Sequence, residues 1–198
     1  RNIQDAKYTW PTAAISMIHA GDDQITCMSV SDCTVMFRHK NGAVSLHSGD
    51  PVHQNLDKQA VDHLVRLREA ELLPDDADLH QFRSMLLPLI RPYRSLANRE
   101  GGYGSFTLAV PIREEFIRIS SRNTGDITHI LLMTDGFYDI VDTYKVMDDH
   151  SLMGTVLENG LRSLALEIRS LENADPIGKA YPRLKKSDDT TAVLFSLK

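Results

Sequence analysis

Aspartates that could bind a cation stand at the ends of several strand-like segments of this chain. Asp135 follows the apolar run 130–133 after Thr134, Asp32 lies between two strand-like runs, and Asp188 stands at the start of the last run. If neighbouring sheets bring these strand ends together, several carboxylates converge, which is unfavourable unless they are protonated or bridged by cations. Hard divalent cations such as Mg²⁺ and Mn²⁺ prefer oxygen ligands. The pattern therefore indicates a candidate metal site.

Each of these aspartates also has a simpler interpretation as a turn former. Asp-Gly, as at 135–136, commonly reverses a chain, because glycine accepts a positive φ and aspartate hydrogen-bonds to its own backbone. Aspartate at a strand start or between two strands often plays the same part. Chain positions leave both interpretations open, and the distance between the carboxylates of Asp135 and Asp188 decides between them.

A site of this kind has a definite chemistry if it holds two metal ions. Two divalent ions about 3.5–4 Å apart can hold a water between them and lower its pKa toward neutrality. Such a water attacks a phosphoester without any serine or cysteine nucleophile. The candidate reaction is therefore hydrolysis of a phosphoester by metal-bound water.

Composition bounds the class of protein. The 198 residues, of which 42% are apolar and 25% charged, suit one globular domain over 1–198. A net charge of −5 argues against nonspecific nucleic-acid binding, which needs a basic face. No apolar run approaches the roughly 20 residues that span a bilayer, so no membrane partner is expected. The two cysteines, Cys27 and Cys33, are too few for a disulfide framework, which favours free thiols and a cytoplasmic location.

Hydrophobic periodicity predicts runs of strands separated by helices. Strands are expected at 12–20, three times within 24–47 as an antiparallel meander, near 106–110, as a hairpin of 114–120 with 128–135, and at 188–198. Helices are expected at 55–73, at 77–96 with a kink or end at Pro88, from about Phe137, and at 150–171 with Gly160 inside. Strands grouped in runs with segregated helices favour an α+β fold with largely antiparallel sheets.

Four short motifs, taken in order, resemble one known family. They are "MSVSDCTVMF", "GGYGSF", "LLMTDGFYDIV" and "SDDTTAVLF". In order and spacing they resemble the motifs of 2C-type, metal-dependent serine/threonine protein phosphatases, over nearly the whole chain. The resemblance implies a sandwich of two mainly antiparallel β-sheets flanked by helices, with metals in a cleft at one end. It also implies a phosphorylated protein as substrate and Mg²⁺ or Mn²⁺ as cofactor, with two or more ions in the complete domain.

The resemblance assigns roles to individual aspartates. Asp135 and Asp188 match the metal ligands that carry catalysis, and Asp32 matches an aspartate that approaches an additional, weaker metal. Asp139 matches the last aspartate of the Asp-Gly motif, a water-mediated or indirect ligand. Gly136 is expected to let the chain turn without a side chain that crowds the metals.

The sequence departs from the family pattern in several places. An upstream Asp-Gly-x-Gly loop, whose Asp bridges two metals, and a phosphate-binding Arg are not found, since the only Asp-Gly is at 135–136. Ser31 replaces the usual glycine before Asp32, Tyr138 stands where tryptophan is common, and Asp189 occupies an asparagine position. We therefore expect either that an N-terminal part has been removed, or that the chain is a degenerate relative with weak or absent turnover.

Three functions remain in competition. The first is a metal-dependent phosphoserine/phosphothreonine phosphatase, and the second is a catalytically degenerate phosphatase-like module that binds or regulates. A third is another metal-dependent phosphotransferase of the haloacid-dehalogenase type, whose Asp-x-Asp-Gly nucleophile motif has no counterpart because Met133 stands where the first Asp would be. The sequence predicts no oligomeric state.

Overall fold

A computed structural model describes residues 11–49, 51–73, 79–108 and 110–197 of the chain. Its strands are β1 (Thr12–Ala13), β2 (Ile15–Ala20), β3 (Gln24–Val30), β4 (Thr34–His39), β5 (Val44–His47), β6 (Phe106–Thr107), β7 (Arg118–Asn123), β8 (Ile127–Met133) and β9 (Ala192–Ser196). Its helices are α1 (Pro51–Glu69), α2 (Leu79–Arg94), α3 (Asp135–Asp142), α4 (Asp149–Asn159) and α5 (Leu161–Ala174). The expected α+β class is confirmed.

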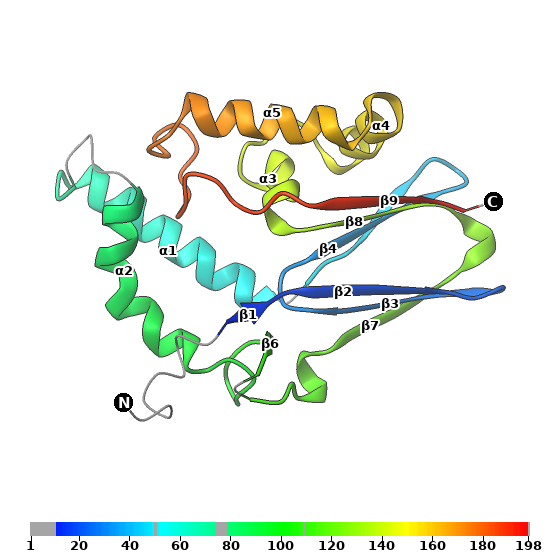
Figure 1. The fold of residues 1–198 in the computed structure, drawn as a ribbon, viewed down its shortest axis with the longest axis horizontal. Coiled ribbons are helices and arrows are strands. Elements are labelled where there is room, and N and C mark those ends of the chain that lie inside the picture. The colour runs from blue at the N-terminus through cyan, green and yellow to red at the C-terminus, as the bar shows by residue number, and fades with distance from the viewer. Residues whose placement is uncertain (1–10, 50, 74–78, 109, 198) are drawn as a thin grey trace.

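The described strands form three antiparallel sheets (Figure 1). The larger two have the strand orders β2-β3-β7 and β5-β4-β8-β9, and a small sheet pairs β1 with β6. The larger sheets pack together through apolar side chains that alternate along their strands, among them Ile25 and Cys27 of β3, Phe37 of β4 and Ile130 of β8. This alternation is the pattern of a strand with one face in a core.

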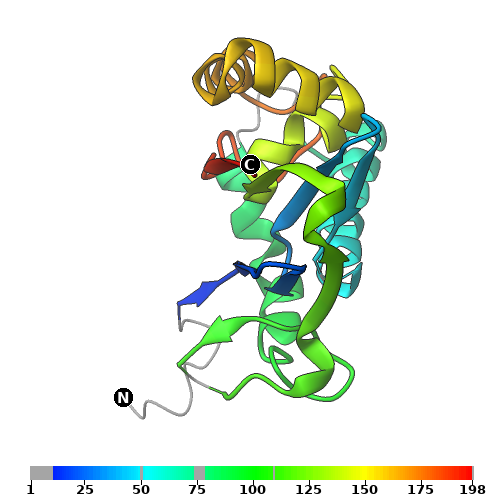
Figure 2. The ribbon, with the colours of Figure 1, turned by 90° about the vertical axis from the view of Figure 1, so that its right-hand side faces the viewer.

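Helices cover the other face of the four-stranded sheet. Figures 1 and 2 show α4 and α5 as a layer over this sheet, with α3 beneath them. Met36 of β4 and Leu131 of β8 meet Ile140 of α3, Leu152 of α4 and Leu164 of α5 in one buried cluster. Strand β8 has apolar residues on both faces, so it packs against the helices on one side and the second sheet on the other. It therefore holds the start of α3, which follows it, in place.

Helices α1 and α2 pack chiefly on each other. They form a separate cluster around Leu64, Leu73, Leu79 and Phe82, to which Leu184 of the loop before β9 adds. Figure 1 shows the pair beside the end of the sheets. The second helix continues through Pro88 to Arg94, so the kink or end expected at Pro88 does not terminate it.

Two predicted strand connections are wrong. The expected meander over 12–47 breaks at 31–33, because β3 pairs with β2 and β7 whereas β4 pairs with β5 and β8. The expected hairpin of 114–120 with 128–135 is likewise a crossover, with β7 in one sheet and β8 in the other. Alternation shows which residues share a face but not which sheet the strand joins, so the sequence could not separate these possibilities.

Other local expectations have mixed outcomes. The Asn41-Gly42 turn does join β4 to β5, with Gly42 at a φ of 86°. The helix expected over 150–171 is instead two helices, because Gly160 has a φ of 77° and ends α4. Cys27 and Cys33 are buried free thiols, as expected. Among the helices of the described residues, none combines the length and apolar character that crossing a bilayer requires.

Candidate metal centre

The candidate site forms where β8 ends and the segment before β9 runs alongside it. Met133, the last residue of β8, pairs with Ala192 on one side and with Thr34 on the other. This register places the start of α3, the segment 188–191 and the crossover 31–33 at one end of the sheet. The aspartates of three distant stretches therefore gather at that end.

Thr134 links the two main segments of the site. Its backbone N–H donates to Thr191 O at 3.0 Å, and its hydroxyl donates to Asp189 O at 2.7 Å. The same hydroxyl accepts from Thr191 N–H at 3.1 Å. These bonds extend the β8–β9 ladder beyond the strands themselves, so Asp135 and Asp189 are held in a fixed relation.

Gly136 is required by close packing of the second segment. A Cβ on Gly136 would lie 2.6 Å from Asp189 O and 2.8 Å from Asp188 Cβ, distances that real side chains do not adopt. The missing side chain thus makes room for the backbone of 188–189. The sequence predicted a turn without a crowding side chain at Gly136. The structure shows that the absent side chain lets the backbone of 188–189 pack against α3.

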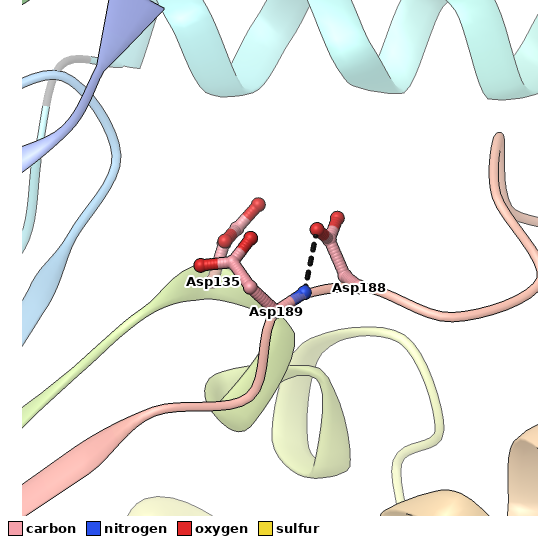
Figure 3. Close-up of side chains that lie close together, drawn as sticks. All are labelled: Asp135, Asp188 and Asp189. Atoms are coloured by element: carbon pink, nitrogen blue, oxygen red, sulfur yellow. Dashed lines mark hydrogen bonds between the residues drawn. The ribbon is translucent and has the colours of Figure 1, made fainter.

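Three carboxylates converge on this point. Asp135, Asp188 and Asp189 each offer an oxygen, and these oxygens all lie within 4.8 Å of one another (Figure 3). Asp135 and Asp188, distant in sequence, are therefore brought together as predicted. Asp189 joins them. Of these two neighbours, the sequence interpretation had given the metal role to Asp188 only.

Electrostatics show that the surrounding protein compensates Asp135 only in part, through a hydrogen bond from the Gly136 N–H and the charge of Lys185. Burial, reinforced by the negative charges of Asp32 and Asp188, raises its pKa to about 7. An acid with this pKa is partly protonated near neutrality in the metal-free protein. A cation beside it would restore the charged form, because opposite charge lowers a carboxyl pKa.

Asp188 and Asp189 are in different electrostatic states. Burial alone would raise the pKa of Asp188, but the hydrogen bonds and charge of Lys185, together with hydrogen bonds from Asp189, lower it below the usual range. The hydrogen bond with Asp188 and then burial raise the pKa of Asp189. Of this pair, Asp188 is therefore the stronger acid.

Asp32 lies near the three carboxylates but outside their group. Its hydroxyl neighbour Ser31 donates to it at 3.2 Å. Its charge raises the pKa of Asp135, and it also adds to the effect of burial that raises the pKa of Cys33 to about 11. Ser31, with a φ of 73°, provides the left-handed turn between the two sheets that the usual glycine would provide.

Asp139 is one helical turn beyond Asp135 and also lies outside the group. Its carboxylate accepts a hydrogen bond from Thr143 of the same helix. Burial raises its pKa to about 6, and the charge of Asp188 adds to this effect. The geometry fits an indirect contribution to the site, as the resemblance implies for this position.

An ion pair on α5 between Arg169, which is partly exposed, and the buried Glu172 holds the backbone of Asp188. Arg169 donates through Nη2 to Asp188 O at 2.7 Å and through Nη1 to Glu172 at 2.6 Å. Glu172 is almost fully buried. The pair fixes the backbone of Asp188 to a helix, an arrangement that periodicity could not reveal because it joins a helix to a loop.

Sequence reasoning missed Asp189, Thr134 and Lys185. Asp189 is adjacent to a predicted ligand, and Lys185 precedes that ligand by three residues, so local spacing was the available signal for both. The sequence offered little indication of the part of Thr134, since that part depends entirely on its bonds to the segment 189–191.

The donor set suits a hard divalent cation. Three carboxylates of the described residues converge here, beside the ammonium of Lys185. The pKa of Asp135 is raised first by burial, and that of Asp189 first by its hydrogen bond with Asp188. Mg²⁺ and Mn²⁺ select such oxygen donors, and their charge would relieve the repulsion among these acids. Comparison with models of known families, with curated proteins and with solved structures returns no match for this chain.

Proposed function

We propose that this chain is a metal-dependent phosphoserine/phosphothreonine protein phosphatase domain of the 2C type. The observation that carries the proposal is the convergence of Asp135 and Asp188, whose oxygens lie within 4.8 Å although their segments are distant in sequence. The β8–β9 pairing brings their segments side by side, and both carboxylates turn toward the same point. Their meeting is what the motif resemblance requires.

The architecture supports the same proposal. Two antiparallel sheets pack face to face, helices cover the outer face of one of them, and the acids gather at one end. We interpret this α+β arrangement as the two-sheet sandwich of the 2C-type phosphatases, with 1–198 as a single domain.

Each aspartate has a proposed part in the site. Asp135 and Asp188 hold Mg²⁺ or Mn²⁺, and Asp189 offers a third oxygen. Asp32 approaches a further ion, and Asp139 contributes through Thr143 and the helix rather than directly. When bound, the metal supplies an activated water as nucleophile and positive charge to neutralise phosphoryl oxygens. The substrate is a phosphorylated protein, and the proposed location is the cytoplasm.

A second candidate function has its own supporting observation. Both carboxylate oxygens of Asp188 accept hydrogen bonds from Lys185, at 2.8 and 2.6 Å. In a phosphatase-like module that has lost catalysis, an internal cation of this kind could replace the metal permanently. That module would bind or regulate a phosphoprotein without hydrolysing it.

Calorimetric titration with Mn²⁺ tests the proposal. We expect Asp135→Asn to weaken Mn²⁺ binding by at least about tenfold, since loss of a ligand exceeds the 10–100-fold loss seen when only supporting residues change. Asp126→Asn is the matched control, because Asp126 is an exposed acid at the opposite end of β8. It should leave binding unchanged.

Phosphopeptide hydrolysis with and without chelator separates the two candidate functions. Slow hydrolysis that chelator and Asp135→Asn both abolish supports the phosphatase. Mn²⁺-independent binding of the peptide without hydrolysis supports the degenerate module. Mn²⁺ binding that Asp135→Asn leaves intact would refute the proposed site.

A further inference from the structure

Lys185 occupies the carboxylate that the proposed metal needs. Its ammonium lies 2.8 Å from Asp188 Oδ1 and 2.6 Å from Oδ2, so it bridges both oxygens. The backbone N–H of Asp189 donates to the same Oδ1 at 2.9 Å. Asp188 therefore has both oxygens engaged by its own loop.

The loop that carries Lys185 is anchored by buried charge. Arg183 pairs with Asp175 at 3.0 Å, and both side chains are only 9% exposed. The Nε of Arg183 donates to Lys186 O at 3.2 Å, next to Lys185. From α1, Arg68 donates to the carbonyls of Ile177 and Gly178.

These anchors fix the backbone on both sides of the Lys185–Asp188 pair. Arg183 acts on the N-terminal side, and Arg169 holds Asp188 O at 2.7 Å on the other. The lysine side chain itself is 44% exposed. The backbone is thus held while the ammonium can move into solvent.

We infer that Lys185 is an internal counter-ion of the acidic cluster, which a divalent cation must displace from Asp188 in order to bind. This inference rests on the proposed function, because it assumes that Asp188 is a metal ligand. It assigns Lys185 a regulatory part: the lysine sets the metal concentration at which the site fills.

Competition follows from the shared oxygens and from charge. An ion coordinated by Asp188 would approach oxygens that now lie within hydrogen-bond distance of Nζ, and two cations at one carboxylate repel each other. Partly exposed ion pairs contribute little to stability, so displacement is easy. The arrangement therefore suits exchange at moderate metal concentration and does not close the site permanently.

The test compares Lys185→Met with Lys186→Met. Lys186 is exposed and adjacent in sequence, so its replacement removes the same charge from the same loop without touching Asp188. We expect Lys185→Met to tighten Mn²⁺ binding by about fivefold, the factor that the upper range for an exposed ion pair implies. Lys186→Met should change binding by less than about twofold.

Thermal melting in chelator gives a readout that does not depend on metal. We expect Lys185→Met to lower the midpoint by about 2–4 °C, because the acidic cluster loses its counter-ion. Lys186→Met should melt as the wild type does. Mn²⁺ should raise the midpoint of Lys185→Met more than that of the wild type.

Two results would overturn the inference. One is an equal gain in Mn²⁺ affinity for both lysine variants, which would reduce the effect to net charge. The other is weaker binding by Lys185→Met, which would make the lysine a support of the metal site.

Failure of the proposed function would look different. Mn²⁺ would not bind the wild type, or Asp135→Asn would leave binding intact. The inference that a metal displaces Lys185 from Asp188 would then be overturned as well. A lower melting midpoint for Lys185→Met only would identify Lys185–Asp188 as a permanent ion pair of the degenerate module.

Discussion

Asp175 at the end of α5, which is buried, and Asp135 at the end of β8, which is half-buried, have opposite surroundings. Asp175 accepts hydrogen bonds from Arg183 at 3.0 Å and from the backbone N–H groups of Lys179 and Tyr181 at 2.7 and 2.9 Å. Burial alone would raise its pKa, but these donors lower it below the usual range. At Asp135, burial and the like charges of Asp32 and Asp188 act together and raise the pKa to about 7.

The difference separates a structural acid from a candidate functional one. Asp175 is satisfied by the chain itself, so it has no electrostatic reason to bind anything further. Asp135 faces other acids and burial, and the hydrogen bond from Gly136 and the charge of Lys185 offset these effects only in part. Strongly perturbed acids with specific charged neighbours are where functional sites tend to occur.

Breaking the ion pair of Asp175 with Arg183 should have the largest effect on stability. Arg183→Met leaves Asp175 buried without its ion-pair partner, and we expect the free energy of unfolding to fall by about 3–5 kcal/mol. Urea unfolding in chelator measures this change. Arg162→Met, an exposed substitution on α5, is the control and should cost less than about 0.5 kcal/mol.

A double variant sharpens the comparison at that site. Asp175→Asn combined with Arg183→Met should recover part of the loss, because no buried charge is left unpaired. Equal stability of Arg183→Met and wild type would show that the pair does not hold the loop.

Asp135 should have a smaller effect on the free energy of unfolding, and this effect should depend on pH. Because the pKa of Asp135 is raised in the folded state, the folded protein binds more protons than the unfolded one between about pH 4 and pH 7. Asp135 should therefore lower the free energy of unfolding of the metal-free protein by about 2–4 kcal/mol as the pH rises through this window. Asp139, whose pKa burial raises to about 6, acts in the same direction and is common to wild type and Asp135→Asn.

Comparison with Asp135→Asn isolates this contribution. Burial, then the charges of Arg122 and Arg118, lower the pKa of His47, so its contribution to stability is lost as the pH falls and opposes that of Asp135. The difference between wild type and Asp135→Asn cancels the histidine. A difference that does not vary with pH would contradict the raised pKa of Asp135.

The smallest effect should come from the neutral link between the two halves of the site. Thr134→Val removes the hydroxyl that donates to Asp189 O and accepts from Thr191 N–H. This hydroxyl makes no capping hydrogen bond to α3, so the loss concerns only the link. We expect about 1 kcal/mol of destabilisation together with weaker Mn²⁺ binding.

Thr190→Val is the control for that link. The Thr190 hydroxyl makes only long bonds, at 3.3 Å to Gly136 O and 3.4 Å to Asp188 O. Its loss should be smaller than that of Thr134. If both variants lose the same stability, the short bond of Thr134 has no special part in joining the segments.

Much of the local structure was predictable because it depends on local chemistry. Alternation located β3, β4 and β8, and the Asn41-Gly42 turn was recognised because glycine accepts a positive φ. The break at Gly160 was missed, since glycine inside a helix and glycine that ends one differ only in backbone conformation. The crossovers at 31–33 and 124–126 were missed because strand pairing depends on distant partners.

The candidate site was predicted in part for the same reason. Asp135 and Asp188 could be named from their positions at strand ends and from motif order. To predict the parts of Asp189 and Lys185, one must know the path of the loop before β9. The Arg183–Asp175 ion pair fixes this path, and hydrophobic periodicity does not reveal such a contact. Asp32 acts on Asp135 through its charge from a crossover between sheets, and its part at a further metal stays a prediction.

By itself, the sequence determined the class of fold, the strand that carries Asp135 and the chemical character of the acids, because these follow from side-chain type and from alternation along the chain. Only the tertiary structure decided which acids share a neighbourhood, because that depends on the β8–β9 register, on the space left by Gly136 and on the hydrogen bonds of Arg169 and Arg183. It also decided that a lysine lies against Asp188. Electrostatic energy depends on distances through space, and these are set by the packed fold.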